Sequence, residues 1–181
     1  RIGHTTQVTN DIETIRNAQK ILLPGVGAFD AAMERINASE LRKVLDNKAT
    51  VDRIPILGIC LGMQLLTNQS EEGILPGLGW IQASTKRFPS LPGLKIPHMG
   101  WNLVSQSNKS ELTIDLPANA RFYFVHSYYV QVANPDHSIL RSMYGTTFDS
   151  AIQCGNIYGA QFHPEKSHKF GMQLLSNFAK L

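Results

Sequence analysis

The sequence predicts an α/β fold: three layers, helices on both faces of a partly mixed sheet. Three observations predict it. The first two-fifths of the chain alternate buried-strand and amphipathic-helix patterns, the middle and later parts hold turn signals and short β-rich segments, and one helical stripe closes the chain. No repeat, low-complexity tract or linker interrupts the 181 residues, so we expect a single domain over 1–181.

The first part of the chain consists of strand–helix units. The apolar run at 20–23 predicts a short buried strand, and apolar positions between 29 and 36 share one helical face. A further helix over 41–45 follows Ser39, a suitable N-cap. The continuous apolar run at 54–59 is typical of a strand covered on both faces, and 61–66 predicts the helix after it.

The later part of the chain is rich in β-type segments. Strands are predicted at 121–125, 128–131, 139–140 and 157–162, and Cys154 falls in a hairpin turn. A closing helix begins after Ser167, its expected cap. The apolar stripe of this helix comprises Phe170, Leu174, Phe178 and Leu181.

Composition narrows the function classes. Hydrophobic residues make up 43% and charged residues 17%, and the net charge is only +3, which excludes disordered, coiled-coil and basic-tail architectures. No nucleic-acid partner follows from so small a charge, and no apolar stretch reaches the ~20 residues of a membrane span. Two cysteines form no disulfide framework, and no signal-peptide pattern is visible, so we expect a cytoplasmic protein.

The segment GICLG at 58–62 lies between a predicted strand and a predicted helix. This is the pattern of a nucleophile elbow with Cys60 at its tip, where glycines allow close backbone approach. The helix N-terminus favours a thiolate, and the N–H of Leu61 is placed to stabilise an oxyanion. The alternative, a buried cysteine acting as a small hydrophobe, is about equally compatible with this segment alone.

The segment HPE at 163–165 favours a catalytic role for Cys60 over the alternative of a buried small hydrophobe. His163 precedes a proline and is expected to be extended, so that His163 and Glu165 lie on the same side of the chain. Glu165 then holds one ring nitrogen and leaves the other to accept the thiol proton. A surface turn with a solvated glutamate is the alternative for this segment alone. Together with the elbow, a Cys60-His163-Glu165 triad explains both segments better.

The glycine loop PGVG at 24–27 follows a predicted strand at the edge where α/β sheets place their ligands. The backbone N–H groups of Val26 and Gly27 are candidates to complete the oxyanion hole with Leu61. The loop matches neither of the glycine-rich phosphate-binding patterns.

These segments resemble the class I glutamine amidotransferases. The segments GICLGMQ (58–64) and HPE carry the resemblance to the class. The segments PGVGAF (24–29), PHMGWN (97–102) and HPEKS (163–167) are similar to the glutaminase subunits of imidazole glycerol phosphate synthases, which serve histidine biosynthesis. The similarity covers nearly the whole chain and implies a flavodoxin-like domain.

The resemblance implies hydrolysis of glutamine to glutamate and ammonia through a cysteinyl thioester. It further implies that glutamine is bound by Gln64 and by main chain near Gly27, Ser127 and Tyr128. Gln64 also fits on physical grounds, because it lies one helical turn after Cys60. Without the resemblance, Gln64 is as readily an ordinary helix-surface glutamine.

The resemblance also implies a heterodimer with a cyclase of the (β/α)₈ barrel type, which uses the ammonia to make imidazole glycerol phosphate and aminoimidazole carboxamide ribotide. Pro97, Met99 and Trp101 alternate along one face of an extended segment and suit an interface, although a core-facing strand fits the same pattern. Lys166 is a candidate for a charge contact between the partner and the active site. No cofactor is implied.

Two expectations are negative. We expect no metal site, since no ligand spacing is visible among the remaining candidates, Cys154, His4, His98, His137 and His168. The family begins with a strand and most of a helix that this sequence lacks, and residues 1–4 look like the end of that helix.

Three other functions remain open at this point. The chain is alternatively a glutaminase subunit for anthranilate, aminodeoxychorismate or guanylate synthesis. It is alternatively a non-catalytic regulatory subunit that retains the triad residues, or an elbow-cysteine peptidase. The segment at 97–102 distinguishes the first of these from the leading interpretation.

Overall fold

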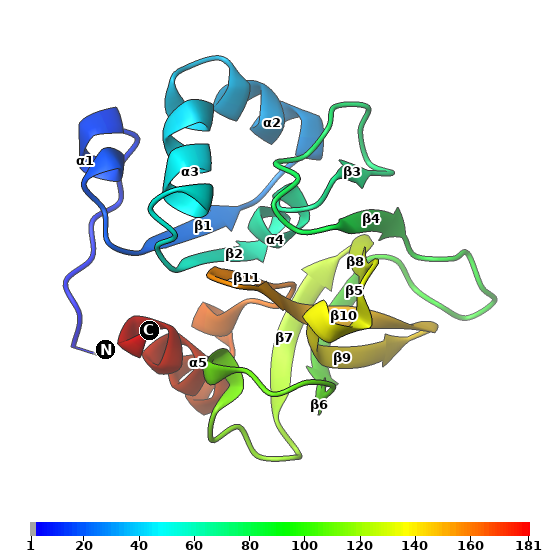
Figure 1. Cartoon of the computed structure of the whole chain (residues 1–181). Helices are drawn as coiled ribbons and strands as arrows, with labels where there is room; N and C mark the ends of the chain where they lie inside the picture. The colour runs from blue at the N-terminus through cyan, green and yellow to red at the C-terminus, as the bar shows by residue number, and fades with distance from the viewer. Residues whose placement is uncertain (1–2) are drawn as a thin grey trace.

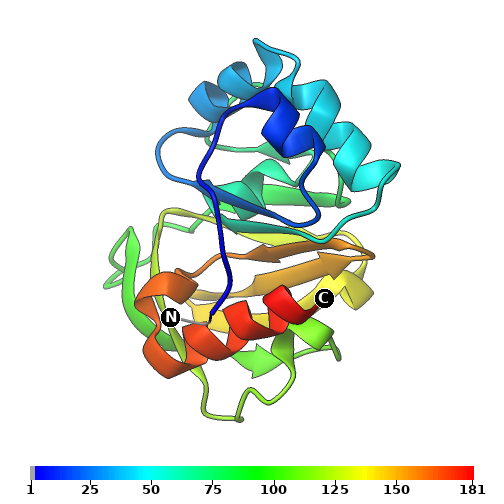
Figure 2. The ribbon, with the colours of Figure 1, turned by 90° about the vertical axis from the view of Figure 1, so that its left-hand side faces the viewer.

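The computed structural model describes residues 3–181 as three layers. A nine-stranded mixed sheet forms the middle layer, and helices cover both of its faces (Figures 1 and 2). Strands β1, β2 and β11 pair in parallel, whereas β10 pairs antiparallel with β11, β8 and β9. The predicted three-layer α/β class with a partly mixed sheet is confirmed.

The main path of the sheet runs β1-β2-β11-β10-β8-β4-β3, and β9 and β6 continue from β10. The strands of this sheet are β1 (Ile21–Gly25), β2 (Ile56–Cys60), β3 (Gln69–Ser70), β4 (Ala83–Arg87), β6 (Ser105–Gln106), β8 (Tyr128–Val132), β9 (Ser138–Tyr144), β10 (Thr146–Cys154) and β11 (Ile157–Ala160). A separate antiparallel ribbon is made of β5 (His98–Leu103) and β7 (Arg121–His126).

The helices divide between the two faces of the sheet (Figure 2). One face carries α1 (Ile12–Arg16), α2 (Phe29–Asn37), α3 (Leu41–Thr50) and α4 (Leu61–Leu65). The other face carries α5 (His168–Lys180). Three short 3₁₀ turns complete the set, η1 (Glu111–Thr113), η2 (Pro135–His137) and η3 (Pro164–Lys166).

Strand β2 is the centre of the molecule, because both of its faces are buried. Ile56 belongs to the apolar core beneath α2 and α4, while Leu57 and Ile59 belong to the core beneath α5. Such double burial explains why this segment is a continuous apolar run without alternation.

Several predicted boundaries are corrected. The strand predicted at 157–162 ends at Ala160. The N-cap of α3 is Glu40, although Ser39 Oγ still accepts a hydrogen bond from the Leu41 N–H at 3.2 Å. Ser167 occupies the N-cap position of α5 without capping it, because its hydroxyl donates to the His163 carbonyl at 2.6 Å and accepts from the Tyr123 N–H at 3.0 Å.

The sequence analysis missed β4, α1 and most of the β9–β10 hairpin. Polar residues weaken the local signal in these elements: β4 forms through its pairing with the distant strand β8, and α1 packs against α3. The helix end expected at residues 1–4 lies partly outside the described residues, and Gly3 and His4 lie in no helix.

Candidate active site

Cys60 lies at the turn from β2 into α4 with φ 55° and ψ −111°. A positive φ is uncommon for a residue with a Cβ, and it is the backbone strain expected of a nucleophile elbow. The turn lifts the side chain from the end of the strand while the helix N-terminus points at it. The predicted elbow geometry at this segment is confirmed.

The glycines of the elbow serve close packing against β1. A Cβ on Gly58 would meet the Gly62 carbonyl oxygen at 2.5 Å, and a Cβ on Gly62 would overlap the Leu23 carbonyl oxygen. A Cβ on Gly25 would meet the Gly62 nitrogen at 2.8 Å. The start of α4 therefore lies directly on the end of β1, and any larger residue would push the elbow away.

The Cys60 thiol is buried and weakly hydrogen-bonded. Its Sγ lies 3.9 Å from the Val125 carbonyl oxygen and 3.9 Å from Gln161 Nε2. Burial raises the pKa of the thiol to about 11, against the smaller lowering effect of the Leu61 backbone N–H. Cys60 is therefore a neutral thiol at physiological pH, and a base must remove its proton during attack.

His163 supplies a suitable base. Its Nδ1 lies 2.8 Å from Glu165 Oε1, so the carboxylate accepts the Nδ1 proton and Nε2 carries the free lone pair. His163 Nε2 is buried and has no hydrogen-bond partner among the described residues. An unpaired basic nitrogen in a buried position is ready to accept a proton.

The pairing of His163 with Glu165 arises differently from the expectation. Glu165 lies in the 3₁₀ turn η3, so the two residues are not part of one extended strand. The turn folds the carboxylate back toward the imidazole, and the His163 backbone N–H is fixed to the Tyr123 carbonyl at 2.9 Å. The predicted contact is present, but the explanation through alternation along a strand is wrong.

Neighbouring strands bring together the two segments that carry the cysteine and the histidine. Strands β2 and β11 are parallel neighbours in which Ile59 pairs with Ala160, one residue before Cys60 and Gln161 respectively. Gln161 reaches the sulfur, and the charges of Glu165 and Lys166 act on the Cys60 thiol in opposite directions. The segments that carry the three predicted triad residues therefore lie near one another at the carboxyl ends of these strands, with no hydrogen bond between His163 Nε2 and the Cys60 sulfur in the described structure.

The expected oxyanion loop lies beside the elbow. Gly25 pairs with Cys60 across β1 and β2, so Val26 and Gly27 follow at the same edge as the nucleophile. The Val26 side chain is exposed, and Gly27 has φ 103°, a backbone conformation that favours glycine. The Leu61 N–H, next along the chain, lowers the pKa of the Cys60 thiol, although burial outweighs this effect.

Gln64 is buried beneath the site. Its Nε2 donates to the Tyr128 carbonyl at 3.1 Å and to Gln161 Oε1 at 3.2 Å. Both amide hydrogens are therefore used within the protein. The interpretation of Gln64 as an ordinary helix-surface glutamine is wrong, since only 4% of its surface is exposed.

Sequence reasoning missed Gln161. This fully buried side chain donates to Cys60 Sγ and accepts from Gln64, so it lies between the nucleophile and the expected substrate residue. A glutamine two residues before His163, pointing to the same side of an extended chain, is the sequence signal that would have identified it.

The expected substrate main chain, Ser127 and Tyr128, forms the junction where β7 leaves the two-stranded ribbon and β8 enters the main sheet. The Ser127 carbonyl accepts from the Phe88 N–H at 3.1 Å. The Tyr128 carbonyl accepts from Gln64 Nε2, which connects this junction to the elbow helix.

The expected interface residues form an exposed apolar face on β5. Met99, Trp101 and Leu103 alternate along the strand and are 62%, 45% and 58% exposed. The alternative that this strand faces the core is therefore wrong. Pro97 is exposed just before β5, and the Lys166 amine lies 6.0 Å from the centre of the Tyr123 ring.

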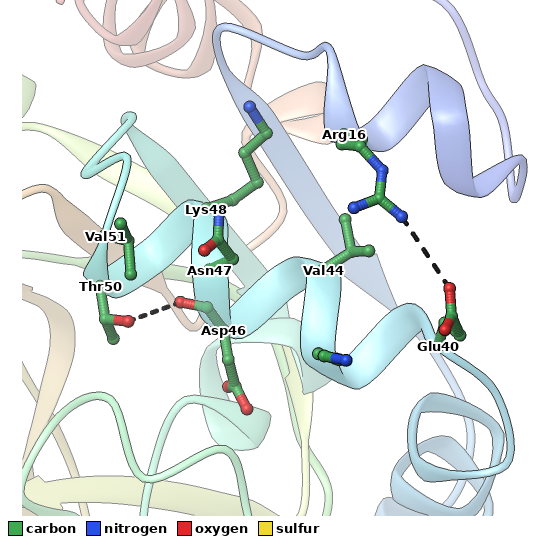
Figure 3. Close-up of a pocket in the computed structure, with 9 residues that line it drawn as sticks. Arg16, Glu40, Val44, Asp46, Asn47, Lys48, Thr50 and Val51 are labelled. Atoms are coloured by element: carbon green, nitrogen blue, oxygen red, sulfur yellow. Dashed lines mark hydrogen bonds and ion pairs between the residues drawn. The ribbon is translucent and has the colours of Figure 1, made fainter.

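Two surface hollows lie outside the triad. One, of about 420 Å³, follows α3 and includes Arg16 and Glu40, whose side chains lie 3.9 Å apart (Figure 3). The other, of about 590 Å³, lies beside Trp101 and includes the His168 ring stacked on its indole. Neither hollow is lined by Cys60, His163 or Glu165.

Within residues 3–181, no cluster of three or more His, Cys, Asp or Glu side chains has the arrangement of a metal site. None of the helices in this described range combines the length and hydrophobicity needed to cross a membrane.

Comparison with known proteins defines the class. The family model "Glutamine amidotransferase class-I" matches residues 2–181. The chain belongs to the class I glutamine amidotransferase family. A crystal structure titled "glutamine amidotransferase" has the same fold, with a TM-score of 0.73 at 13% identity over 99% of this chain and 87% of that one. A glutamine amidotransferase from Thermotoga maritima gives a TM-score of 0.65 at 16% identity, over 96% of this chain and 80% of that one.

Curated relatives define the subgroup. The chain is 51% identical to "Imidazole glycerol phosphate synthase subunit HisH 2" of Methanococcus maripaludis, over 99% of this chain and 89% of that protein. It is 49% identical to "Imidazole glycerol phosphate synthase subunit HisH" of Bdellovibrio bacteriovorus, over 96% of this chain and 87% of that protein. The resemblance stated from the motifs is confirmed, and with it the predicted enzyme class.

Proposed function

We propose that this chain is the glutaminase of an imidazole glycerol phosphate synthase and that Cys60, His163 and Glu165 perform the reaction. The observation that carries the proposal is the buried Nε2 of His163, which has no partner among the described residues while Glu165 holds the other ring nitrogen. The similarity to HisH subunits over nearly the whole chain supports the choice of synthase.

The first half-reaction forms a thioester. His163 Nε2 takes the Cys60 proton as the sulfur attacks the side-chain carbonyl carbon of glutamine. Negative charge then develops on the carbonyl oxygen, where the Leu61 N–H and the loop at Val26 and Gly27 stabilise it. His163 returns the proton to the leaving nitrogen, and ammonia departs.

The second half-reaction uses water. His163 Nε2 accepts a proton from the attacking water, the carbon–sulfur bond breaks, and glutamate and the free thiol are regenerated. Glu165 stays ionised and stabilises the imidazolium that forms twice in the cycle. In this proposal the substrate is bound by Gln64 and by main chain near Gly27, Ser127 and Tyr128.

Ammonia requires a second active site. In bulk water most of it would be protonated and lost as a nucleophile, so a partner must receive it in a water-excluded path. We propose a cyclase of the (β/α)₈ type, bound at the exposed face made by Met99 and Trp101, with Pro97 at its edge. Lys166, adjacent to the triad glutamate, then makes a charge contact with the partner near the site.

A glutaminase assay tests the proposal. The chain is mixed with the cyclase and the nucleotide ligand of that cyclase, and the glutamate formed from glutamine is measured. We expect Cys60→Ala and His163→Ala to lower kcat at least ~10³-fold. Cys154→Ala is the matched control, because Cys154 ends strand β10 at the hairpin and contacts no triad residue; its kcat should stay within about twofold. Unchanged turnover in Cys60→Ala would favour a non-catalytic role.

A further inference from the structure

A line of hydrogen bonds leads away from the catalytic residues toward the exposed strand β5. It begins at the Tyr128 carbonyl oxygen, which accepts from Gln64 Nε2 at 3.1 Å and from His126 Nδ1 at 2.7 Å. The two lone pairs of this oxygen are thus occupied by two buried side chains. The carbonyl is fixed from both sides.

The line continues through a second histidine. His98 Nδ1 lies 3.0 Å from His126 Nε2, and His98 Nε2 lies 3.3 Å from Asn102 Nδ2. Asn102 Nδ2 also donates to the Met143 carbonyl at 2.9 Å. His98 and Asn102 belong to β5, the strand that exposes Met99 and Trp101.

The direction of every bond in this line follows from the chemistry of its ends. A carbonyl oxygen only accepts, so His126 Nδ1 carries its hydrogen and His126 Nε2 accepts from His98 Nδ1. An amide nitrogen only donates, so His98 Nε2 accepts from Asn102. Both imidazoles are therefore neutral Nδ1–H tautomers, and each of their four nitrogens has a partner.

Burial keeps both rings neutral. Burial lowers the pKa of His126 to about 3 and that of His98 to about 4, and the two rings are only 6% and 3% exposed. A neutral His126 ring keeps Nε2 as the acceptor for the His98 Nδ1–H, so the line of bonds persists over the physiological pH range.

We infer that His126 is a positioning residue for the glutamine site, holding the Tyr128 carbonyl that in turn holds Gln64, and that His98 ties this support to strand β5. The inference rests on the proposed function. His126 touches neither sulfur nor substrate; it acts through Tyr128, Gln64 and Gln161, the last of which contacts Cys60.

The place of His126 in the fold explains why such support is needed. His126 is the last residue of β7, and Tyr128 is the first of β8, so the chain changes sheets between them. The ladder of β8 with β4 begins at this junction, where Tyr128 pairs with Arg87, and the His126 side chain adds its own hydrogen bond to the Tyr128 carbonyl. The rings of Phe88 and Phe148 pack against His126 at 5.2 and 5.4 Å between centroids and keep it in place.

Two substitutions separate positioning from packing. In His126→Asn the amide nitrogen occupies the place of Nδ1 and can still donate to the Tyr128 carbonyl. In His126→Gln the amide occupies the place of Nε2 and loses that donor. Both variants lose the ring, so both should lose a similar amount of thermal stability.

Glutaminase kinetics of the two variants, measured in the complex with the cyclase, test the inference. We expect His126→Gln to raise KM for glutamine about five- to tenfold with kcat changed less than about threefold, and His126→Asn to keep KM within about twofold of the parent. Equal KM values in the two variants would overturn the positioning role. Glutamine hydrolysis that survives Cys60→Ala would instead overturn the proposed function.

A second measurement reads the tautomers directly in the parent protein. Nitrogen NMR of the full chain labelled with ¹⁵N-histidine distinguishes the two neutral tautomers and the cation. We expect two histidines to remain neutral Nδ1–H tautomers from pH 6 to 8. Their signals are assigned to His98 and His126 by the signal that disappears in His98→Asn and in His126→Asn. An Nε2–H tautomer or a cation at His126 in this range would contradict the proposed line of bonds.

Discussion

At the scale of single residues, the proposed site combines a cysteine with a strained backbone and a histidine with one hydrogen-bonded and one unpaired ring nitrogen. Cys60 adopts a positive φ, and its thiol is buried with a pKa raised to about 11. His163 leaves one nitrogen unpaired while Glu165 fixes the other. Both features cost folding free energy, which is characteristic of residues retained for chemistry rather than stability.

The raised pKa of Cys60 makes stability depend on alkaline pH. The unfolded thiol ionises near pH 9 and the folded thiol near 11, so the unfolded state binds fewer protons in between and stability falls as pH rises. We expect the free energy of unfolding to fall by about 2 kcal/mol more for the parent than for Cys60→Ser between pH 8.5 and 11.

Urea unfolding at several pH values measures this difference. Cys154→Ser is the control and should follow the parent, because no comparable burial acts on that partly exposed side chain. Identical alkaline slopes for the parent and Cys60→Ser would contradict the assigned burial of the nucleophile.

At the scale of elements, backbone contacts through glycines fix the site. The elbow helix α4 lies on the end of β1 through Gly62, and α5 lies on η3 through Gly171, where a Cβ would overlap the Pro164 carbonyl oxygen. The turn that carries Glu165 is therefore supported directly by a helix backbone. A glycine lowers the helix propensity of α5 at position 171, but it allows the helix backbone to lie against the Pro164 carbonyl.

Gly171→Ala tests that contact. An exposed helical glycine gains up to ~1 kcal/mol of stability on replacement by alanine, whereas here the overlap with Pro164 should reverse the sign and cost about 1–3 kcal/mol. We also expect glutaminase kcat to fall about tenfold or more, because η3 must shift with Glu165.

The matched control is Met172→Ala, one residue along α5, whose side chain is 42% exposed. It should leave kcat within about twofold and stability within about 1 kcal/mol. A more stable Gly171→Ala protein with parental kcat would show that α5 does not support the turn.

At the scale of the whole molecule, the three segments of the candidate site meet at one end of the sheet. The carboxyl ends of β1, β2 and β11 bring together the glycine loop, the nucleophile and the segment leading to His163. The ribbon of β5 and β7 adds an exposed apolar face, and its other side reaches the Tyr128 junction. A partner bound to that face would therefore contact the strand that supports the glutamine site.

Trp101→Ala should weaken binding of the cyclase by about 30-fold or more, since a large aromatic residue in an interface contributes at least about 2 kcal/mol. Its effect on the stability of the isolated chain should be smaller than about 1.5 kcal/mol, because Trp101 is half exposed and its aromatic contacts are the stacked His168 ring and the edge of Tyr123.

Titration calorimetry measures the affinity. Ile74→Ala, a 94% exposed residue elsewhere on the surface, is the control and should bind like the parent. Parental affinity in Trp101→Ala would place the interface on another face.

The sequence alone determined the features that depend on neighbours along the chain. Apolar periodicity placed β1, α2, β2, α4 and α5, and the glycines around Cys60 indicated an elbow, because such steric limits act within a few residues. The contact between His163 and Glu165 was also local, although a 3₁₀ turn rather than an extended strand produces it.

Only the tertiary structure decided what depends on strand order. The adjacency of β2 and β11 brings Cys60 close to the histidine segment, and it places Gln161 against the sulfur and Gln64. The pairing of β5 with β7 sets His98 opposite His126. These contacts join segments that are far apart in the chain. The apolar periodicity of a single segment does not determine which strands become neighbours in the sheet.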